Sequence, residues 1–279
     1  MVVTRFAPSP TGYLHLGHAF SAFFAWDMAR RSGGRFLLRI EDIDPQRSRP
    51  EFVDAIYEDL AWIGLRWTTP VRRQSTHLPD YIAALAVLAD ADLLYPCFCT
   101  RKDIAEEIAR AGIAPHGPDG PIYPGICRGL DAAERGALIK SGHSYALRLD
   151  IDKAADRAGP LDFTDYDLGR VDVDPTLVGD IVLARKDVST SYHLSVSVDD
   201  ALQRITHVTR GEDLLPATHV HRLLQALLGL PQPEYHHHHL LSDDEGRRLA
   251  KRDGAMTLRA LRTDGQSPAE VRALIGFNS

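Results

Sequence analysis

The stretch RFAPSPTGYLHLGH, residues 5–18, decides how the N-terminal part of the chain folds. Apolar residues up to Phe6 predict a short buried strand, prolines and a glycine then break it, and a helical pattern begins near Leu16. His15 and His18 are three positions apart, so we expect both rings on one face of the first helical turn. Helix-start amides favour phosphate and imidazoles add tunable donors, so the stretch indicates an anion site. For this spacing alone, ordinary half-buried histidines are the alternative.

The chain then continues as a strand-helix-strand unit. Apolar residues keep helical spacing as far as Met28, Gly33 and Gly34 turn the chain, and residues 35–40 predict the next strand. A right-handed crossover and a parallel sheet are expected from this order, with the ligand at the carboxyl edge of the strands. Glu41 follows at that edge, where a carboxylate is a natural partner for an ammonium group. A solvated acidic turn is the alternative.

Composition narrows the class of protein. The chain has 279 residues, of which 44% are hydrophobic and 25% charged, with a net charge of −6. These values are typical of a globular protein with one large domain and an insertion, or two modest domains. No apolar run reaches the roughly 18 to 20 residues of a membrane span and no signal pattern is visible, so we expect a cytoplasmic protein without membrane contact. The negative charge argues against strong nonspecific binding to a polyanion.

Three motifs in this order resemble the class I aminoacyl-tRNA synthetase family, and its glutamyl branch in particular: APSPTGYLHLGH at 7–18, RIEDIDPQRS at 39–48 and RLAKR at 248–252. The third stands where the family has a mobile lysine loop, usually KMSKS, and only its second lysine, Lys251, is kept here. The resemblance implies an α/β fold, with a Rossmann-type parallel-sheet catalytic core, an inserted zinc-containing α+β subdomain and a short helical C-terminal segment.

The same resemblance implies a division of the chain into four parts. Residues 1–95 would form the first half of the nucleotide-binding core and 96–178 an inserted subdomain that contacts RNA. Residues 179–242 would form the second half of the core, and 243–279 the lysine loop and the short helical segment. No anticodon-binding domain is expected.

The three cysteines suit a metal site better than a disulfide framework. Cys97 and Cys99 form a CxC pair, and Cys127 follows a segment rich in glycine and proline. Three thiolates and one further ligand satisfy tetrahedral zinc, and both His116 and Tyr123 are available as the fourth. Three buried or unpaired cysteines are the alternative. The family resemblance favours Tyr123, because truncated glutamyl-synthetase-like proteins carry a Cys, Cys, Tyr, Cys zinc site in this insertion.

Later segments carry strand and turn patterns. Residues 162–174 are polar and turn-rich, which suits the outer part of the insertion, and 179–186 predict a buried strand with which the core sheet resumes. Residues 204–211 predict a further strand that reaches Arg210. The four histidines 236–239 are compatible with metal binding in principle, but the resemblance makes this segment the last strand of the sheet.

The resemblance also implies roles for individual residues. Catalysis would fall to His15, His18 and Lys251. ATP would be bound by His15, Gly17, His18 and Lys251, with Gly17 leaving the backbone open to close approach. Magnesium would come with ATP, held mainly by phosphates. Guanidinium groups can bind a substrate carboxylate bidentately. The residues implied for L-glutamate are Arg5, Phe6, Ala7, Pro8, Ser9, Glu41, Tyr192 and Arg210.

The expected reaction has two steps. The α-carboxylate of glutamate attacks ATP to give glutamyl-adenylate and pyrophosphate, and the glutamyl group then passes to an RNA. The resemblance favours the family branch that places glutamate on the queuosine base in the anticodon loop of tRNA(Asp), with the protein acting as a monomer. One alternative is a minimal enzyme that charges the 3′ end of tRNA(Glu). Another is a noncatalytic RNA-binding paralogue, suggested by the altered RLAKR motif.

Overall fold

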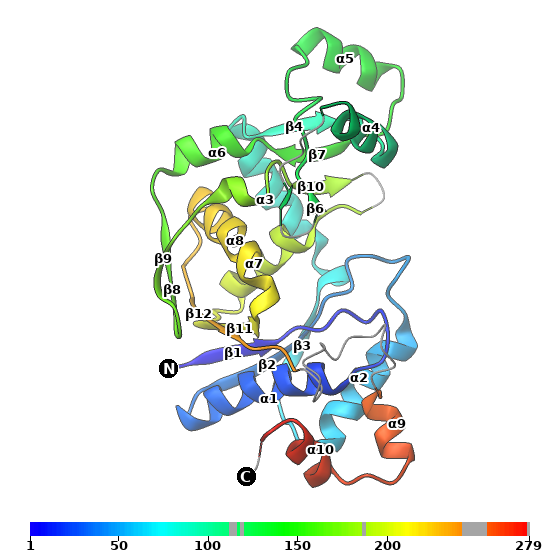
Figure 1. The fold of residues 1–279 in the computed structure, drawn as a ribbon, viewed down its shortest axis with the longest axis vertical. Coiled ribbons are helices and arrows are strands. Elements are labelled where there is room, and N and C mark those ends of the chain that lie inside the picture. The colour runs from blue at the N-terminus through cyan, green and yellow to red at the C-terminus, as the bar shows by residue number, and fades with distance from the viewer. Residues whose placement is uncertain (112–115, 118–119, 186–187, 242–255, 278–279) are drawn as a thin grey trace.

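The computed structural model describes residues 1–279 except 112–115, 118–119, 186–187, 242–255 and 278–279 (Figure 1). The molecule is elongated, with helices α4 (Arg101–Ala111) and α5 (Ala132–Lys140) at the upper end of the view and the N-terminal strands in its lower half. Within the described residues, no helix combines the length and the apolar character that a membrane crossing requires.

The N-terminal strands confirm the predicted strand-helix-strand unit. β1 (Val3–Phe6) pairs in parallel with β2 (Arg35–Ile40), and α1 (Leu16–Arg31) connects them. After α2 (Pro50–Trp62), β3 (Thr68–Arg73) pairs in parallel with β2 on its other side. Almost every residue of β2 is buried, as expected for a parallel sheet covered on both faces. The strands therefore end at one edge, beside the start of α1.

A second group of strands adjoins β1. In spatial order these strands are β11 (His207–Gly211), β12 (Glu234–His238), β8 (Asp162–Asp165) and β9 (Gly169–Asp172). The first three are parallel and β9 is antiparallel to β8. The backbone N–H of Thr206 donates to the carbonyl oxygen of Val3 at 3.0 Å, which joins the two groups. The predicted histidine strand is confirmed, but residues 162–174 do not lie in an outer subdomain: their hairpin extends the parallel strands.

Helices pack together above this second group of strands (Figure 1). They are α3 (Leu78–Asp90), α6 (Ile151–Ala158), α7 (Tyr192–Leu202) and α8 (Leu215–Leu227). The start of α7 is fixed by Ser191, whose side chain accepts a hydrogen bond from the Leu194 backbone N–H. The buried faces of α7 and α8 meet in one apolar cluster that includes Leu194, Val198 and Val220. This packing holds Tyr192, the first residue of α7, at the edge of the core.

The inserted part has an antiparallel sheet of its own. Its strands are β10 (Val182–Arg185), β7 (Ala146–Leu149) and β4 (Leu94–Cys97). The strand predicted within 179–186 is therefore present, but the expectation that it resumes the core sheet is wrong, because it pairs with β7. A small ladder of β5 (His116–Gly117) and β6 (Gly120–Pro121) lies in the same part. Short 3-10 turns lie at Gln74–Thr76, Pro175–Leu177 and Glu212–Leu214.

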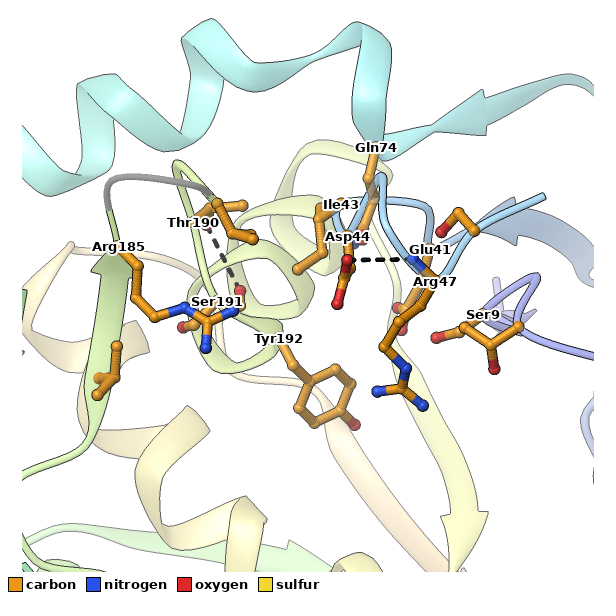
Figure 2. Close-up of a pocket in the computed structure, with 14 residues that line it drawn as sticks. Ser9, Glu41, Ile43, Asp44, Arg47, Gln74, Arg185, Thr190, Ser191 and Tyr192 are labelled. Carbon is orange, nitrogen blue, oxygen red and sulfur yellow. Dashed lines mark hydrogen bonds between the residues drawn. The ribbon is translucent and has the colours of Figure 1, made fainter. Parts of the chain in front are cut away.

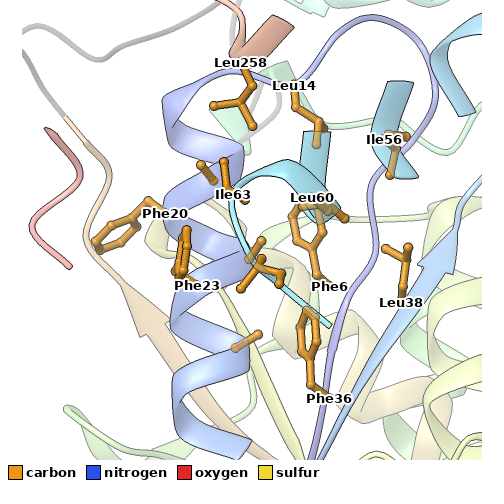
Figure 3. Close-up of a cluster of buried hydrophobic side chains, with 14 of the residues drawn as sticks. Phe6, Leu14, Phe20, Phe23, Phe36, Leu38, Ile56, Leu60, Ile63 and Leu258 are labelled. Atoms are coloured by element: carbon orange, nitrogen blue, oxygen red, sulfur yellow. The ribbon is translucent and has the colours of Figure 1, made fainter. Parts of the chain in front are cut away.

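The largest apolar cluster joins the two ends of the sequence (Figure 3). Phe6 and Leu14 pack with residues of α1 and α2, and Leu258 of α9 (Leu258–Thr263) inserts into the same cluster. The Leu258 backbone N–H also donates to the Leu14 carbonyl oxygen at 2.8 Å. α10 (Pro268–Leu274) follows and begins with a capping box formed by Ser267 and Glu270. The C-terminal helices thus support the loop that carries the histidine pair.

Candidate active site

A cavity of about 520 Å³ opens where β1 and β11 end and α1 begins. It gathers most of the residues that the sequence singled out for substrate binding and catalysis. Those that line it are Arg5, Phe6, Ala7, Pro8, Ser9, His15, His18, Glu41, Tyr192 and Arg210. Gly17 does not line the cavity, and Lys251 lies outside the described residues.

The histidine pair caps the first helix. His15 is the N-cap of α1, and its Nδ1 accepts a hydrogen bond from the Gly17 backbone N–H at 3.1 Å. Nδ1 of His18 accepts from the His15 backbone N–H at 3.2 Å, and the ring centroids lie 3.8 Å apart. Since an accepting nitrogen has no proton, each ring carries its hydrogen on Nε2. The Gly17 amide thus donates to His15 within the loop, and the expected close approach of ATP to the Gly17 backbone stays a prediction.

Arg5 is held by one residue of helix α7 and one of strand β11. Its Nε donates to Oδ1 of Asp200 at 3.0 Å, and its Nη1 donates to the carbonyl oxygen of Thr209 at 3.1 Å. Burial alone would raise the pKa of Asp200, but the guanidinium groups of Arg5 and Arg39 hold that pKa below its usual value. Arg5 therefore has a fixed anionic partner and further N–H groups to offer a ligand.

Glu41 is bound to an arginine that the sequence analysis did not single out. Arg39 is completely buried, and its Nε and Nη2 donate to Oε1 of Glu41 at 3.3 and 3.1 Å. Its Nη1 donates to Asp200 at 2.8 Å. Burial raises the pKa of Glu41 despite the opposing effect of Arg39 and Arg5. Arg39 links the carboxylates of Glu41 and Asp200, and the signal for it was a charged residue among the apolar residues in the middle of β2.

A second cavity, of about 470 Å³, shares a wall with the first (Figure 2). Ser9, Thr11, Glu41 and Tyr192 line both cavities. Burial raises the pKa of Tyr192, which keeps its phenol protonated and able to donate a hydrogen bond. The second cavity is mixed in charge. Its other lining residues are Ile43, Asp44, Arg47, Ser48, Gln74, Val182, Arg185, Val188, Thr190 and Ser191. It therefore connects the core with strand β10 of the inserted part.

The three cysteines gather as a candidate metal centre. One ligand atom from each of Cys97, Cys99 and Cys127 lies within 4.8 Å of the others. The sulfur atoms of Cys99 and Cys127 are 3.4 Å apart, and the hydroxyl of Tyr123 lies 3.3 Å from the sulfur of Cys97 and 3.6 Å from that of Cys99. These separations suit a tetrahedral ion such as Zn²⁺. The side chain of His116, the other predicted fourth ligand, lies outside the described part.

An arginine, also missed from the sequence, supports this centre. The guanidinium carbon of Arg148 lies 3.8 Å from the ring centroid of Tyr123. Its Nη1 donates to the carbonyl oxygen of Asp180 at 2.5 Å. Arg148 lies on β7, so the ring of Tyr123 packs directly on the inserted sheet.

Comparison with known proteins adds to this geometry. Residues 1–277 match the family model described as tRNA synthetases class I (E and Q), catalytic domain. A Glutamyl-Q tRNA(Asp) synthetase of Rhodobacter capsulatus is 52% identical over 99% of this chain and 100% of its own length. A protein of the same name from Nocardia farcinica is 46% identical over 97% of this chain and 82% of its own.

Solved structures agree with the sequence relatives. A glutamate tRNA ligase from Elizabethkingia meningosepticum, in complex with its amino acid, superposes with a TM-score of 0.80 and 29% identity. The match covers 98% of this chain and 60% of that one. The α/β fold with a parallel sheet is therefore shared with a larger protein.

Proposed function

Because the chain belongs to the family of class I tRNA synthetases for glutamate and glutamine, we propose that it activates L-glutamate with ATP and transfers it to queuosine in the anticodon loop of tRNA(Asp). The proposal depends chiefly on the full-length match to the Rhodobacter capsulatus relative, whose name contains this acceptor. The cavity at the ends of β1 and β11 supports the amino-acid half of the reaction, because it combines two buried arginines with a buried carboxylate.

The amino acid would be held by charge complementarity. Arg5 and Arg210 would take the carboxylates of glutamate, Glu41 its ammonium group, and the phenol of Tyr192 would donate a hydrogen bond. The loop 6–9 would close the remaining wall. A glutamine amide would leave a guanidinium charge unmatched, so the cavity would favour the acid over its amide.

ATP would bind beside the histidine pair. Nε2–H groups of His15 and His18 would donate to phosphate oxygens as negative charge grows during attack on the α-phosphorus. The start of α1, including the backbone near Gly17, adds the positive end of the helix dipole. Lys251 would supply a positive charge for the leaving pyrophosphate. Magnesium bound with ATP would screen phosphate charge and orient the chain of phosphates.

The acceptor would enter through the second cavity. That cavity shares Glu41 and Tyr192 with the glutamate site and reaches β10, so a base placed there would lie next to the activated carboxyl group. Structural zinc at Cys97, Cys99, Tyr123 and Cys127 would hold the inserted part that faces the RNA. We expect residues 1–95 and 179–242 to serve as the two halves of the core and 96–178 as the RNA-contacting insertion, except that β8 and β9 belong to the core sheet and β10 to the inserted sheet. Residues 243–279 would supply the lysine loop and the short helices. The protein would act as a cytoplasmic monomer.

Two experiments test this proposal. Glutamate-dependent exchange of pyrophosphate into ATP should occur without RNA, whereas glutamine should support little exchange. Labelled glutamate should then appear on tRNA(Asp) that contains queuosine and not on the same tRNA without queuosine. Label on tRNA(Glu) would favour a glutamate–tRNA ligase, the activity named for the Elizabethkingia structure. Absence of exchange with every RNA would favour a noncatalytic binder.

A further inference from the structure

A network of histidine side chains contacts the buried guanidinium of Arg210. Nε of Arg210 donates to Nε2 of His237 at 3.3 Å, and its Nη1 lies 3.0 Å from Nδ1 of His221. Beyond them, Nδ1 of His237 lies 2.7 Å from Oδ2 of Asp165, and Nε2 of His221 lies 3.1 Å from Nδ1 of His193. The residues come from strands β8, β11 and β12 and helices α7 and α8. Three strands of the second group and two helices therefore contribute to the surroundings of one side chain.

The hydrogen-bonding chemistry of arginine determines which ring nitrogen of each histidine carries the proton. A guanidinium can only donate, so Nε2 of His237 and Nδ1 of His221 must both be lone-pair acceptors. The proton of His237 is then on Nδ1 and is donated to Asp165, and the proton of His221 is on Nε2 and is donated to His193. Both imidazoles are neutral. Burial lowers the pKa of His237 to about 4 and that of His221 well below its usual value, and the charge of Arg210 adds to both effects.

Neutral partners leave the charge of Arg210 available. Arg5 and Arg39 each contact the carboxylate of Asp200. Within the described part of the chain, by contrast, no carboxylate lies at ion-pair distance from Arg210, and Asp165 reaches it only through the ring of His237. A carboxylate in place of either imidazole would hold the guanidinium equally well but would cancel the charge that a substrate anion needs.

The number of N–H groups that Arg210 has left to donate also fits the binding of a substrate carboxylate. Three of the five N–H groups of Arg210 go to His237, His221 and the hydroxyl of Thr218. One N–H remains on each terminal nitrogen, which is what a bidentate carboxylate requires. Arg210 lines the cavity, whereas neither imidazole does. The two histidines can therefore act on a ligand only through Arg210.

We propose that His221 and His237 are positioning residues that fix the guanidinium of Arg210 without neutralising it, and thereby set the preference of the site for a dicarboxylic amino acid over its amide. This inference rests on the proposed function, because it takes Arg210 as the partner of a glutamate carboxylate. It assigns a role to His221, which the sequence analysis did not single out, and to His237, which the family resemblance placed only in a strand of the sheet.

Matched substitutions separate the positioning role from simple packing. His221→Asn keeps an acceptor where Nδ1 stands, and His237→Gln keeps one where Nε2 stands, whereas leucine at either position removes the acceptor. In pyrophosphate exchange, the leucine variants should raise the KM for glutamate at least tenfold and leave the KM for ATP within about twofold. The amide variants should recover most of the loss. His221→Asp should bind glutamate poorly and narrow the preference for glutamate over glutamine.

Several outcomes would overturn the inference. Equal KM values for glutamate in wild type and leucine variants would do so, as would equal losses in leucine and amide variants. A parallel rise in the KM for ATP would indicate general damage to the core instead. Glutamate binding measured by calorimetry separates this inference from the proposed function. Wild-type protein that neither binds nor activates glutamate would remove both, whereas active wild type with unaffected leucine variants would remove this inference alone.

Discussion

At the scale of single residues, the site depends on how buried charges are partnered. Arg39 is sealed from solvent and lies between Glu41 and Asp200, so it organises the carboxylates behind the cavity. Arg210 is also buried but is held by neutral imidazoles. A sequence shows which residues are charged but not which pairs will meet across 160 or more positions. The sequence therefore indicated the motifs themselves, whereas the pairing of Arg39 with Asp200 could not be predicted from it.

Replacing Arg210 should affect one substrate much more than the other. Truncating one partner of a buried charge pair costs about 2 to 5 kcal/mol, which corresponds to about 30-fold or more in affinity. Arg210→Ala should therefore raise the KM for glutamate at least about 30-fold in pyrophosphate exchange while changing the KM for ATP little. Arg157→Ala, on the exposed part of α6, is the control. Equal losses for both substrates would contradict the assigned role.

Asp59 should make stability depend on pH. Burial raises its pKa from 3.8 to about 6, and neither carboxylate oxygen has a hydrogen-bond donor among the described residues. The unfolded chain then loses this proton at lower pH than the folded protein, so stability falls as pH rises from about 4 through 6. Asp59→Asn removes this loss. In urea unfolding, the difference between the free energies of unfolding of Asp59→Asn and the wild type should increase in favour of the variant by about 1 kcal/mol between roughly pH 5 and roughly pH 8.

Asp54 provides a matched comparison for that measurement, because it lies on the exposed side of the same helix α2. Asp54→Asn should show no such widening. If Asp59→Asn and the wild type had the same pH dependence of the unfolding free energy, the ionised Asp59 carboxylate would not destabilise the folded protein as predicted.

At the scale of elements, the pairing of strands was the feature hardest to predict from the sequence. Residues 162–174 and 179–186 are short segments, and their polarity or apolar character says nothing about which strand lies beside them. The first segment joins β12 and the second joins β7. Signals carried by local sequence were more reliable, as in the strands and the helix start of the strand-helix-strand unit. Local chemistry sets these features, whereas sheet order is settled by contacts between distant parts of the chain.

Helix α9 should stabilise the loop that carries the histidine pair. Leu258 is fully buried beside Leu14, which directly precedes His15. Leu258→Ala should cost about 2 to 5 kcal/mol of unfolding free energy and also raise the KM for ATP, because the loop loses its support. Leu274→Ala, at an exposed position on α10, should change neither quantity. A destabilised Leu258→Ala with normal ATP kinetics would show that the loop holds itself.

The cysteine cluster should depend on each of its ligands. Cys99→Ser removes one thiolate from the group formed with Cys97 and Cys127. We expect less zinc per chain by elemental analysis and faster proteolysis within the inserted part, because loss of a bound metal would loosen the fold around it. Ser141→Ala, at the exposed end of α5, should keep both properties of the wild type. Unchanged zinc content in Cys99→Ser would refute its role as a ligand.

At the scale of the whole molecule, the cavity belongs to no single part of the chain. β1 supplies Arg5, β11 supplies Arg210 and α7 supplies Tyr192, and the link between β1 and the second strand group brings them together. The first motif alone indicated an anion site, but only the assembled sheet places the arginines around it. A substitution that separates the two strand groups should therefore abolish both the use of the amino acid and the use of the nucleotide.

The contact between Leu14 and Leu258 also has a consequence for how the chain is made. On the ribosome, the first strand and the histidine loop leave the exit tunnel long before residue 258 is translated. Until then the apolar side chains of the nascent N-terminal segment are exposed to solvent, and β1 also lacks its neighbouring backbone at Thr206. We would expect early-arrested translation products to be held by chaperones, and mature shape to arise only once the last helices emerge.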